Sequence, residues 1–437
     1  MILRRYRYAV ALAITIMLAA PHANAITLTL RGPEPESVAP NTDLTSTIWA
    51  SSGGGTMVKI ATVGNDAPGG GTFSEMGVPS ISPESQVIFG AEVTAPDGAA
   101  RWEIFRGDPA ASADWRVVRA IENSAASSRC VPNIKLDPYP IAGSNGEIAF
   151  IAPEAAGSDA LFRYADGELT CAVRIGDRTA EGHQLEMMHF GSAMMAPSGE
   201  VAFIGRISDS GARRESHAYR TGSRLATMLV TPLGPIHEVA VEGARTPGGS
   251  RYLAGFSLPA VVSTRRGPIV AFTAINSRGA NSRGYGLYVF RAGKTIEVLA
   301  SGDRTSIGRV SFLSNGRPAL SAGGSIAVRG SSGDRRAIYS IRDGHPSVVV
   351  AQGHATEVGS RIVMFGDPVV SASGRVMFGI IDNDDRNLLY AVRPGNVMRI
   401  SIPPESDGEL VGGLSPQIFA GTLVINEAGA VAFIGGK

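Results

Sequence analysis

Short runs of alternating apolar and polar residues recur along this chain, each broken by a tight turn rich in Ser, Asn and Gly. In most copies the strand after the turn ends in Val or Ile, then Ala and Phe. Alternation of period two around such a turn predicts a β-hairpin. The seven copies span residues 79–89, 140–150, 193–203, 261–272, 318–328, 368–378 and 423–433.

A second pair of strands is predicted after each of the first six hairpins. The third strand of the unit is expected at residues 102–106, 160–164, 216–220, 287–291, 337–342 and 388–393. A turn and a fourth strand rich in Val and Ile follow, as in residues 295–303. Four antiparallel strands every 50–69 residues is the period of a propeller blade. The third unit also contains strand-like runs at 225–231 and 236–243, and the pattern does not say which is an insertion.

The seventh hairpin lacks a second strand pair, whereas residues 46–66 resemble a third and fourth strand with no hairpin before them. We therefore expect strands from both ends of the chain to close the last blade, which would protect two exposed sheet edges. The predicted fold is all-β: a seven-bladed β-propeller with four antiparallel strands per blade. A single domain of this kind is expected to be a monomer.

The N-terminus has the features of a secretory signal peptide. Arg4, Arg5 and Arg7 precede an apolar run of 13 residues, and a small-x-small sequence ends at Ala25. The run is shorter than the about 20 residues that a membrane-spanning helix needs, which favours a signal peptide over a membrane anchor. No second apolar span follows it, so no membrane insertion is expected after cleavage. The predicted organisation is a signal peptide (1–25), an N-terminal extension or loop (26–45) and the propeller (46–437). The mature protein is expected in the periplasm or outside the cell.

Charge and cysteine content narrow the classes further. Cleavage removes three Arg and no acidic residue, so the formal charge changes from +1 to −2. A general nucleic-acid binder would carry a strong basic excess, and we therefore expect no nucleic-acid partner. Cys130 and Cys171 are the two cysteines, and an oxidising compartment would allow them to form a disulfide. Their spacing alone leaves the pairing open.

The last hairpin carries a recognisable motif. Asn426, Gly429, Ala432 and Phe433 have the spacing of Asn-x-x-Gly-x-x-Ala-Phe-x-Ala, with Gly435 at the last position. This resembles a family of exported tandem-repeat proteins that carry the motif, and the other copies match it in part. The resemblance implies a β-propeller-like fold and no established activity, and it transfers no catalytic residue.

Side chains kept in every unit are predicted to brace the fold rather than to bind a ligand. One series is an Arg at the end of strand three: Arg106, Arg163, Arg220, Arg291, Arg342 and Arg393. Another is aromatic: Phe105, Phe162, Tyr219, Tyr288, Tyr339, Tyr390 and Trp49. A Gly-rich turn motif such as residues 176–182 joins successive units, and we interpret it as structural.

Common catalytic and metal motifs are absent from the sequence, which has no Gly-x-Ser-x-Gly, His-x-x-x-His or Cys-x-x-Cys. No cofactor is expected. Asp382, Asp384 and Asp385 offer oxygen ligands suited to Ca²⁺, but their loop lacks the length and terminal Glu of an EF-hand. A solvated acidic loop is the favoured interpretation.

The loops between strands two and three vary in length and charge, as ligand-binding loops on a rigid scaffold do. Their candidate ligand-binding residues are Arg213, Arg278, Arg283, Arg335 and Arg336. We predict a non-catalytic binding module for an anionic envelope glycan or a protein partner. The alternative is a polysaccharide lyase acting on this loop face.

A lyase needs a base, an acid and a cation that binds the substrate carboxylate. The candidate residues for the base and the acid are His183, His354 and Tyr285, with the Arg cluster as the cation.

Export has a direct test. N-terminal sequencing of the protein recovered outside the cytoplasm should begin at Ile26, because the signal peptide is cleaved after Ala25. A membrane-retained protein that still begins at Met1 would contradict this prediction.

Overall fold

The structure is a computed structural model of the full chain. It describes one compact unit within Asp43–Lys437. The described ranges are 46–51, 58–109, 115–121, 131–134, 138–155, 157–209, 222–232, 234–253, 255–278, 282–356, 359–384, 387–393, 396–400, 423–426 and 428–436. The predicted signal peptide and N-terminal extension lie outside these residues.

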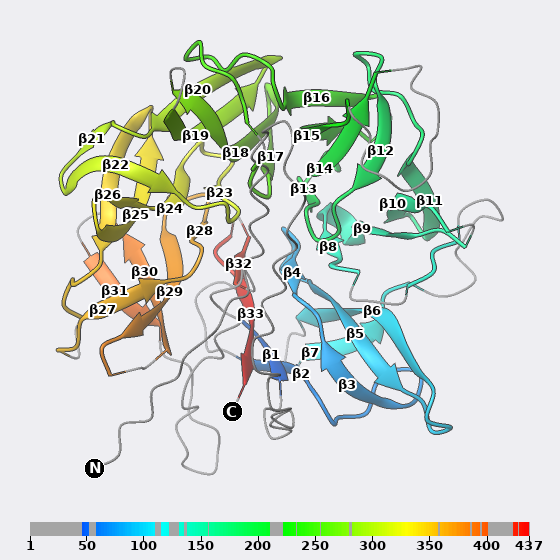
Figure 1. The fold of residues 1–437 in the computed structure, drawn as a ribbon. Helices are drawn as coiled ribbons and strands as arrows, with labels where there is room; N and C mark the ends of the chain where they lie inside the picture. The colour runs from blue at the N-terminus through cyan, green and yellow to red at the C-terminus, as the bar shows by residue number, and fades with distance from the viewer. Residues whose placement is uncertain are drawn as a thin grey trace, which may run out of the picture. The chain divides into compact units, whose positions relative to one another are not determined.

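Seven antiparallel sheets, one for each sequence unit, form the blades of a β-propeller (Figure 1). Blade 1 contains β3 (Thr72–Met76), β4 (Ser80–Ile81), β5 (Val87–Thr94), β6 (Ala100–Pro109) and β7 (Trp115–Arg119). Blade 2 contains β8 (Ile141–Ala142), β9 (Ile148–Pro153), β10 (Asp159–Ala165) and β11 (Glu168–Arg174), with a 3₁₀ turn at Ser144–Gly146. Blade 3 contains β12 (Gln184–Met188), β13 (Met194–Met195), β14 (Val201–Ser208), β15 (Arg224–Val230) and β16 (Ile236–Val241).

The remaining blades follow the same order. Blade 4 contains β17 (Ala260–Thr264), β18 (Gly267–Arg278), β19 (Ser282–Arg291) and β20 (Lys294–Ala300). Blade 5 contains β21 (Arg304–Thr305), β22 (Gly308–Leu313), β23 (Ala319–Leu320), β24 (Ile326–Ser332), β25 (Arg335–Arg342) and β26 (His345–Ala351). Blade 6 contains β27 (Ile362–Phe365), β28 (Val369–Val370), β29 (Val376–Asp382), β30 (Asn387–Arg393) and β31 (Asn396–Ile400). Blade 7 contains β32 (Val424–Ile425), β33 (Val431–Gly436), β1 (Ser46–Ser51) and β2 (Val58–Thr62).

Blade 7 is built from both ends of the chain, as predicted. Its strand order is β2-β1-β33-β32, and β1 pairs with β33 over six residues from Ser46↔Gly436 to Ser51↔Val431. The Asn426 amide extends the closure to blade 1, because it donates hydrogen bonds to the carbonyl oxygens of Ser82 (2.9 Å) and Pro83 (3.3 Å). The motif Asn therefore joins the hairpin turns of the last and first blades.

The hydrophobic core lies between neighbouring blades. Each blade contributes a buried cross-strand pair from its second and third strands, such as Phe89↔Phe105 in blade 1 and Phe433↔Trp49 in blade 7. These side chains pack against the next blade: Phe433 and Trp49 share one cluster with Met377 of blade 6. The repeated aromatic residues thus hold blade to blade, as the sequence indicated.

Blade 3 departs from the prediction. Its third strand is β15, which pairs with β14 from Val201↔Val230 to Ile207↔Arg224, and not residues 216–220. The two strand-like runs are both regular strands, β15 and β16, so neither is an insertion. Met228 takes the place predicted for Tyr219, opposite Phe203. Burial explains the choice, since β15 buries Ala226 and Met228 completely. Arg220 and Tyr219 lie outside the described residues.

The strand nearest the propeller axis is interrupted in blades 1, 3, 5 and 6, where two short pieces pair with the same second strand. A proline precedes the inner piece in five blades: Pro79, Pro140, Pro259, Pro318 and Pro368. Proline has no backbone N–H to donate. It is tolerated there because the inner edge of a blade has no further strand with which such a hydrogen bond would form. The inner strands β4, β8, β13, β17, β23, β28 and β32 surround the axis (Figure 1).

Within the part of the chain that the structure describes, no helical segment has the length and hydropathy needed to cross a bilayer.

The buried closure gives a stability prediction. Phe433→Ala should lower the free energy of unfolding by about 3–5 kcal/mol, because a fully buried ring is replaced by a cavity. Urea unfolding followed by tryptophan fluorescence measures the change. Phe190→Ala is the matched control: that ring is 49% exposed, and its removal should cost far less. Equal losses in the two variants would show that the terminal hairpin is not part of the cooperative fold.

Candidate functional site

Three connections between blades, those before blades 3, 4 and 6, contain a turn in which a Thr hydroxyl contacts the residue four positions later. Thr246 Oγ1 lies 2.8 Å from Ser250 Oγ, and Thr356 Oγ1 lies 2.7 Å from Ser360 Oγ. The connection before blade 3 has the same turn, with His183 at the later position. A structural turn thereby places an imidazole against the sheet of blade 3.

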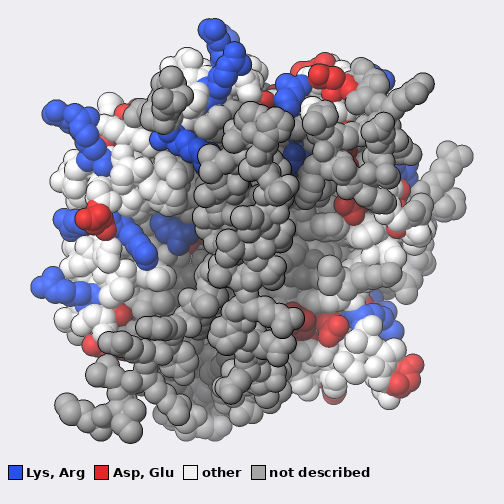
Figure 2. All heavy atoms as spheres, viewed as in Figure 1, with Lys and Arg blue, Asp and Glu red and all other residues white. Residues whose placement is uncertain are grey.

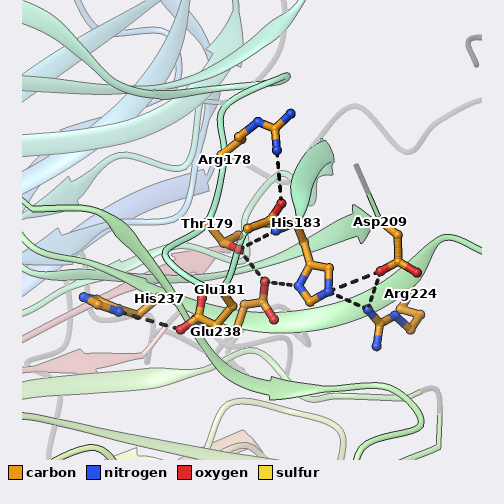
Figure 3. Close-up of polar contacts among 9 residues, drawn as sticks. Arg178, Thr179, Glu181, His183, Asp209, Arg224, His237 and Glu238 are labelled. Atoms are coloured by element: carbon orange, nitrogen blue, oxygen red, sulfur yellow. Dashed lines mark hydrogen bonds and ion pairs between the residues drawn. The ribbon is translucent and has the colours of Figure 1, made fainter. Parts of the chain in front are cut away.

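His183 is the centre of a polar cluster (Figure 3). Its Nδ1 lies 2.7 Å from Glu238 Oε1, and its Nε2 lies 3.0 Å from Arg224 Nη2. The Glu238 side chain is only 5% exposed and also accepts a hydrogen bond from Thr179 Oγ1 at 2.5 Å. Asp209, which is exposed, lies 3.1 Å from Arg224 Nη2.

A carboxylate only accepts, so Nδ1 of His183 donates to Glu238. Its Nε2 faces two groups at once: Arg224, whose guanidinium only donates, and Asp209 Oδ1 at 3.2 Å, which only accepts. A carboxylate behind Nδ1 is the arrangement that orients a catalytic base. Here, however, Arg224 and Asp209 already occupy the Nε2 side of the ring, where such a base would meet its substrate. The cluster therefore fastens the connection to blade 3, beside the backbone bond from Ala180 N to Ile236 O.

The other residues of the lyase hypothesis lie on other blades. Tyr285 is in β19 of blade 4, where its ring packs edge-on against Phe312 with 4.8 Å between centroids. His354 is exposed in the connection before blade 6, where its backbone N–H donates to Ala351. The structure does not bring His183, His354 and Tyr285 together into one site.

Three of the five candidate arginines have described side chains, and all three are exposed. Arg283 lies at the start of β19, and Arg335 and Arg336 begin β25. Arg278 is paired with Ser282 at the end of β18, but its side chain lies outside what is described, and Arg213 lies outside the described residues altogether. The loops predicted here are largely strand, because β18 and β19 pair as far as Arg278↔Ser282.

The remaining candidates have structural surroundings. Asp382 is 1% exposed and accepts hydrogen bonds from Ser360 Oγ (2.7 Å) and the Asp384 backbone N–H (3.0 Å). It is therefore not part of a solvated loop, and the described residues contain no group of three or more metal-ligating side chains. Asp385 and Cys130 lie outside the described residues. Cys171 is in β11, and its disulfide with Cys130 stays a prediction.

Sequence reasoning missed one feature, a cavity of about 260 Å³ on the propeller axis, lined by the inner strands of all seven blades. Its charged lining residues are Arg317 and Asp367, each directly before an inner-strand proline. Other blades place Val78, Tyr139 and Leu258 at this position. Two charges at a repeat position that is uncharged in the other units were the available signal.

The fold defines the protein as a seven-bladed β-propeller closed by strands from its two ends. By sequence, the chain belongs to a family of unknown function, DUF7453, whose model matches residues 29–388. No curated protein matches it.

Solved structures with a similar fold include the β-propeller domain of the trilobed protease from Pyrococcus furiosus, at 11% identity and a TM-score of 0.45, covering 75% of this chain and 83% of that one. The Hadza microbial sialidase Hz136 is 10% identical with a TM-score of 0.36, covering 91% of both chains. The SapL1 lectin bound to α-methyl fucoside is 14% identical with a TM-score of 0.34, covering 76% of this chain and 97% of that one. These similarities concern the fold alone.

The role of Glu238 can be measured by a double-mutant cycle with Thr179. Thr179→Val and Glu238→Ala should show a coupling energy of about 1–3 kcal/mol in urea unfolding, because a buried carboxylate accepts the threonine hydroxyl directly. His354→Ala combined with Glu238→Ala is the control and should be additive within about 0.5 kcal/mol. Additivity in both cycles would remove Glu238 as the residue that fastens this connection.

Proposed function

We propose that the protein is an exported, non-catalytic binding module that holds an anionic glycan or protein partner on one face of blades 4 and 5. We call this the loop face, defined by the turns between the second and third strands: residues 278–282 in blade 4 and 333–334 in blade 5. The proposal includes the kinship with exported tandem-repeat proteins that the Asn426 motif suggests. The proposal is supported by three arginines that are exposed and form no ion pair with any described residue.

Arg283, Arg335 and Arg336 are exposed, and no ion pair among the described residues involves any of them. Their guanidinium groups have no carboxylate partner among the described residues, although Arg335 also donates to the Gln352 carbonyl oxygen. A guanidinium can bind a carboxylate or sulfate with two parallel hydrogen bonds. This unpaired cationic group is the observation that carries the proposal.

The backbone beneath these arginines is held firmly. The blade 4 hairpin packs against blade 5 through the ring contact between Tyr285 and Phe312. In blade 5, Ser311 Oγ donates to the Gly333 carbonyl oxygen at 3.3 Å, and Arg335 Nη2 donates to the Gln352 carbonyl oxygen at 3.3 Å. Because blade 5 contacts the strand that carries Arg283 and its own turn at 333–334, little backbone entropy would be lost there when a ligand binds.

The surrounding charge is of both signs. Arg304 and Arg309 are also exposed in the connection into blade 5, and Asp303 and Asp334 are the nearby acids along the chain. In Figure 2, Lys and Arg side chains gather over blades 4 to 6, at the top and left of the view. Exposed ion pairs contribute about 0.2–1 kcal/mol each, so several must act together and binding should be modest.

The test is a triple variant, Arg283→Ala/Arg335→Ala/Arg336→Ala, measured by biolayer interferometry on heparin, polygalacturonate and neutral dextran. The parent should bind an anionic polymer and not dextran. The variant should bind about threefold to a hundredfold more weakly, the sum of three exposed contacts. Binding by the parent should fade towards about 1 M salt, where the screening length falls to about 3 Å.

The matched control removes three cations from the opposite ends of the same blade 4 strands, Arg265→Ala/Arg266→Ala/Lys294→Ala, all exposed in the described structure. It should bind as the parent does. If both triple variants lose affinity equally, net charge and not the loop face governs binding. If neither loses affinity, the assigned face is wrong. Release of unsaturated sugar ends from polygalacturonate would overturn the non-catalytic assignment.

A further inference from the structure

The axial cavity has a mainly apolar wall. Met194, Leu258, Val369 and Leu423 come from four different blades and line it together with the inner-strand prolines. At about 260 Å³ it is slightly smaller than the roughly 300–1,000 Å³ that holds a drug-sized ligand. A small apolar molecule would fit such a wall, but the wall also carries two charges.

Those charges are not balanced. Asp367 is paired with Arg329, whose Nη2 lies 3.1 Å from Asp367 Oδ1. Arg329 is further satisfied by the carbonyl oxygen of Phe365 at 2.9 Å and by Ser314 Oγ at 3.0 Å. One carboxylate therefore faces two guanidinium groups, and the cavity retains one positive charge on Arg317.

Arg317 has weak protein partners. Its Nη2 reaches from blade 5 to blade 3, where it donates to the carbonyl oxygens of Gly191 and Ser192 at 3.4 Å and of Ala193 at 3.1 Å. Its Nε is fully buried and has no hydrogen-bond acceptor among the described residues. Burial lowers the pKa of Arg317 to about 10, with the nearby Asp367 opposing the shift, so the group is still charged at neutral pH.

Arg317 is half-buried with its Nε fully buried, and a charge taken out of water costs free energy unless it is paired and hydrogen-bonded. An anion in the cavity would supply both the charge and the acceptor that Arg317 lacks. A carboxylate suits the planar guanidinium, and an apolar body attached to it suits the rest of the wall. A bare inorganic anion would gain the first contact and leave the apolar wall unmatched.

We propose that the axial cavity is a binding site for a small carboxylic acid with an apolar body, whose carboxylate pairs with Arg317. The site is independent of the loop face, because its lining residues come from the inner strands. The two proposals can therefore be tested separately, and failure of one leaves the other unaffected.

Isothermal titration calorimetry with octanoate, and with octan-1-ol as the uncharged analogue, tests the proposal on the full-length protein. Octanoate should bind with a stoichiometry of one. Octan-1-ol should bind about tenfold to a hundredfold more weakly, since it lacks the charge-assisted hydrogen bonds to Arg317. Equal binding of the two, or no binding of octanoate, would overturn the proposal.

Two variants locate the site. Arg317→Met keeps the length of the side chain without its charge and should reduce octanoate affinity about tenfold to a hundredfold. It also removes the link between blades 3 and 5, so Leu258→Trp provides a second variant that fills the cavity at the equivalent position of blade 4 and leaves Arg317 in place. It should abolish binding. Arg266→Met, in the hairpin turn of blade 4, is the control and should bind octanoate as the parent does. Parent-like binding by Leu258→Trp, or by a folded Arg317→Met, would overturn the proposal.

Discussion

The backbone ladder between β1 and β33 is the interaction on which the rest of the structure depends. Every hydrophobic cluster of this propeller is made by neighbouring blades, so a ring left open at blade 7 would expose two of them at once. The ladder places Ile48 and Ile434 against blade 1 and Trp49 and Phe433 against blade 6. Pairing the two ends thus lets the apolar surface of seven small sheets become one continuous buried ring.

Polar side chains extend the same closure to the turns and connections. Asn426 ties the last hairpin turn to the first, and His183 with Glu238 ties a connection to blade 3. In two other connections a Ser occupies the place of that histidine, four residues after the same Thr. A residue that is unusual for its repeat position can therefore still hold the turn, here through the backbone N–H of His183 where those two connections use a Ser hydroxyl. This explains why an unusual His in a repeat protein is weak evidence for catalysis.

The two proposed binding regions arise from two different departures from the repeat. On the loop face, turns outside the repeated pattern carry exposed arginines that form no ion pair with any described residue. On the axis, a position that is uncharged in the other units carries Arg317 and Asp367. The first region is suited to a long anionic partner in high dielectric, where each contact is weak. The second is suited to one small anion in low dielectric, where a single contact is strong.

The sequence by itself determined the hairpins, because alternation and turn residues act within about ten residues of each other. The seven copies and the division of the last unit between the two ends of the chain then determined the number of blades and the closure. The prediction from sequence failed at blade 3, where the third strand is β15, with Ala226 and Met228 fully buried, and not the aromatic-containing segment 216–220. Only the tertiary structure decided the axial site. Arg317 donates to the carbonyl oxygens of Gly191, Ser192 and Ala193, which precede it by 124 to 126 positions in the sequence. The cavity beside it exists only when all seven blades are in place. Local patterns specify strands, but closing the ring specifies which side chains share a buried space.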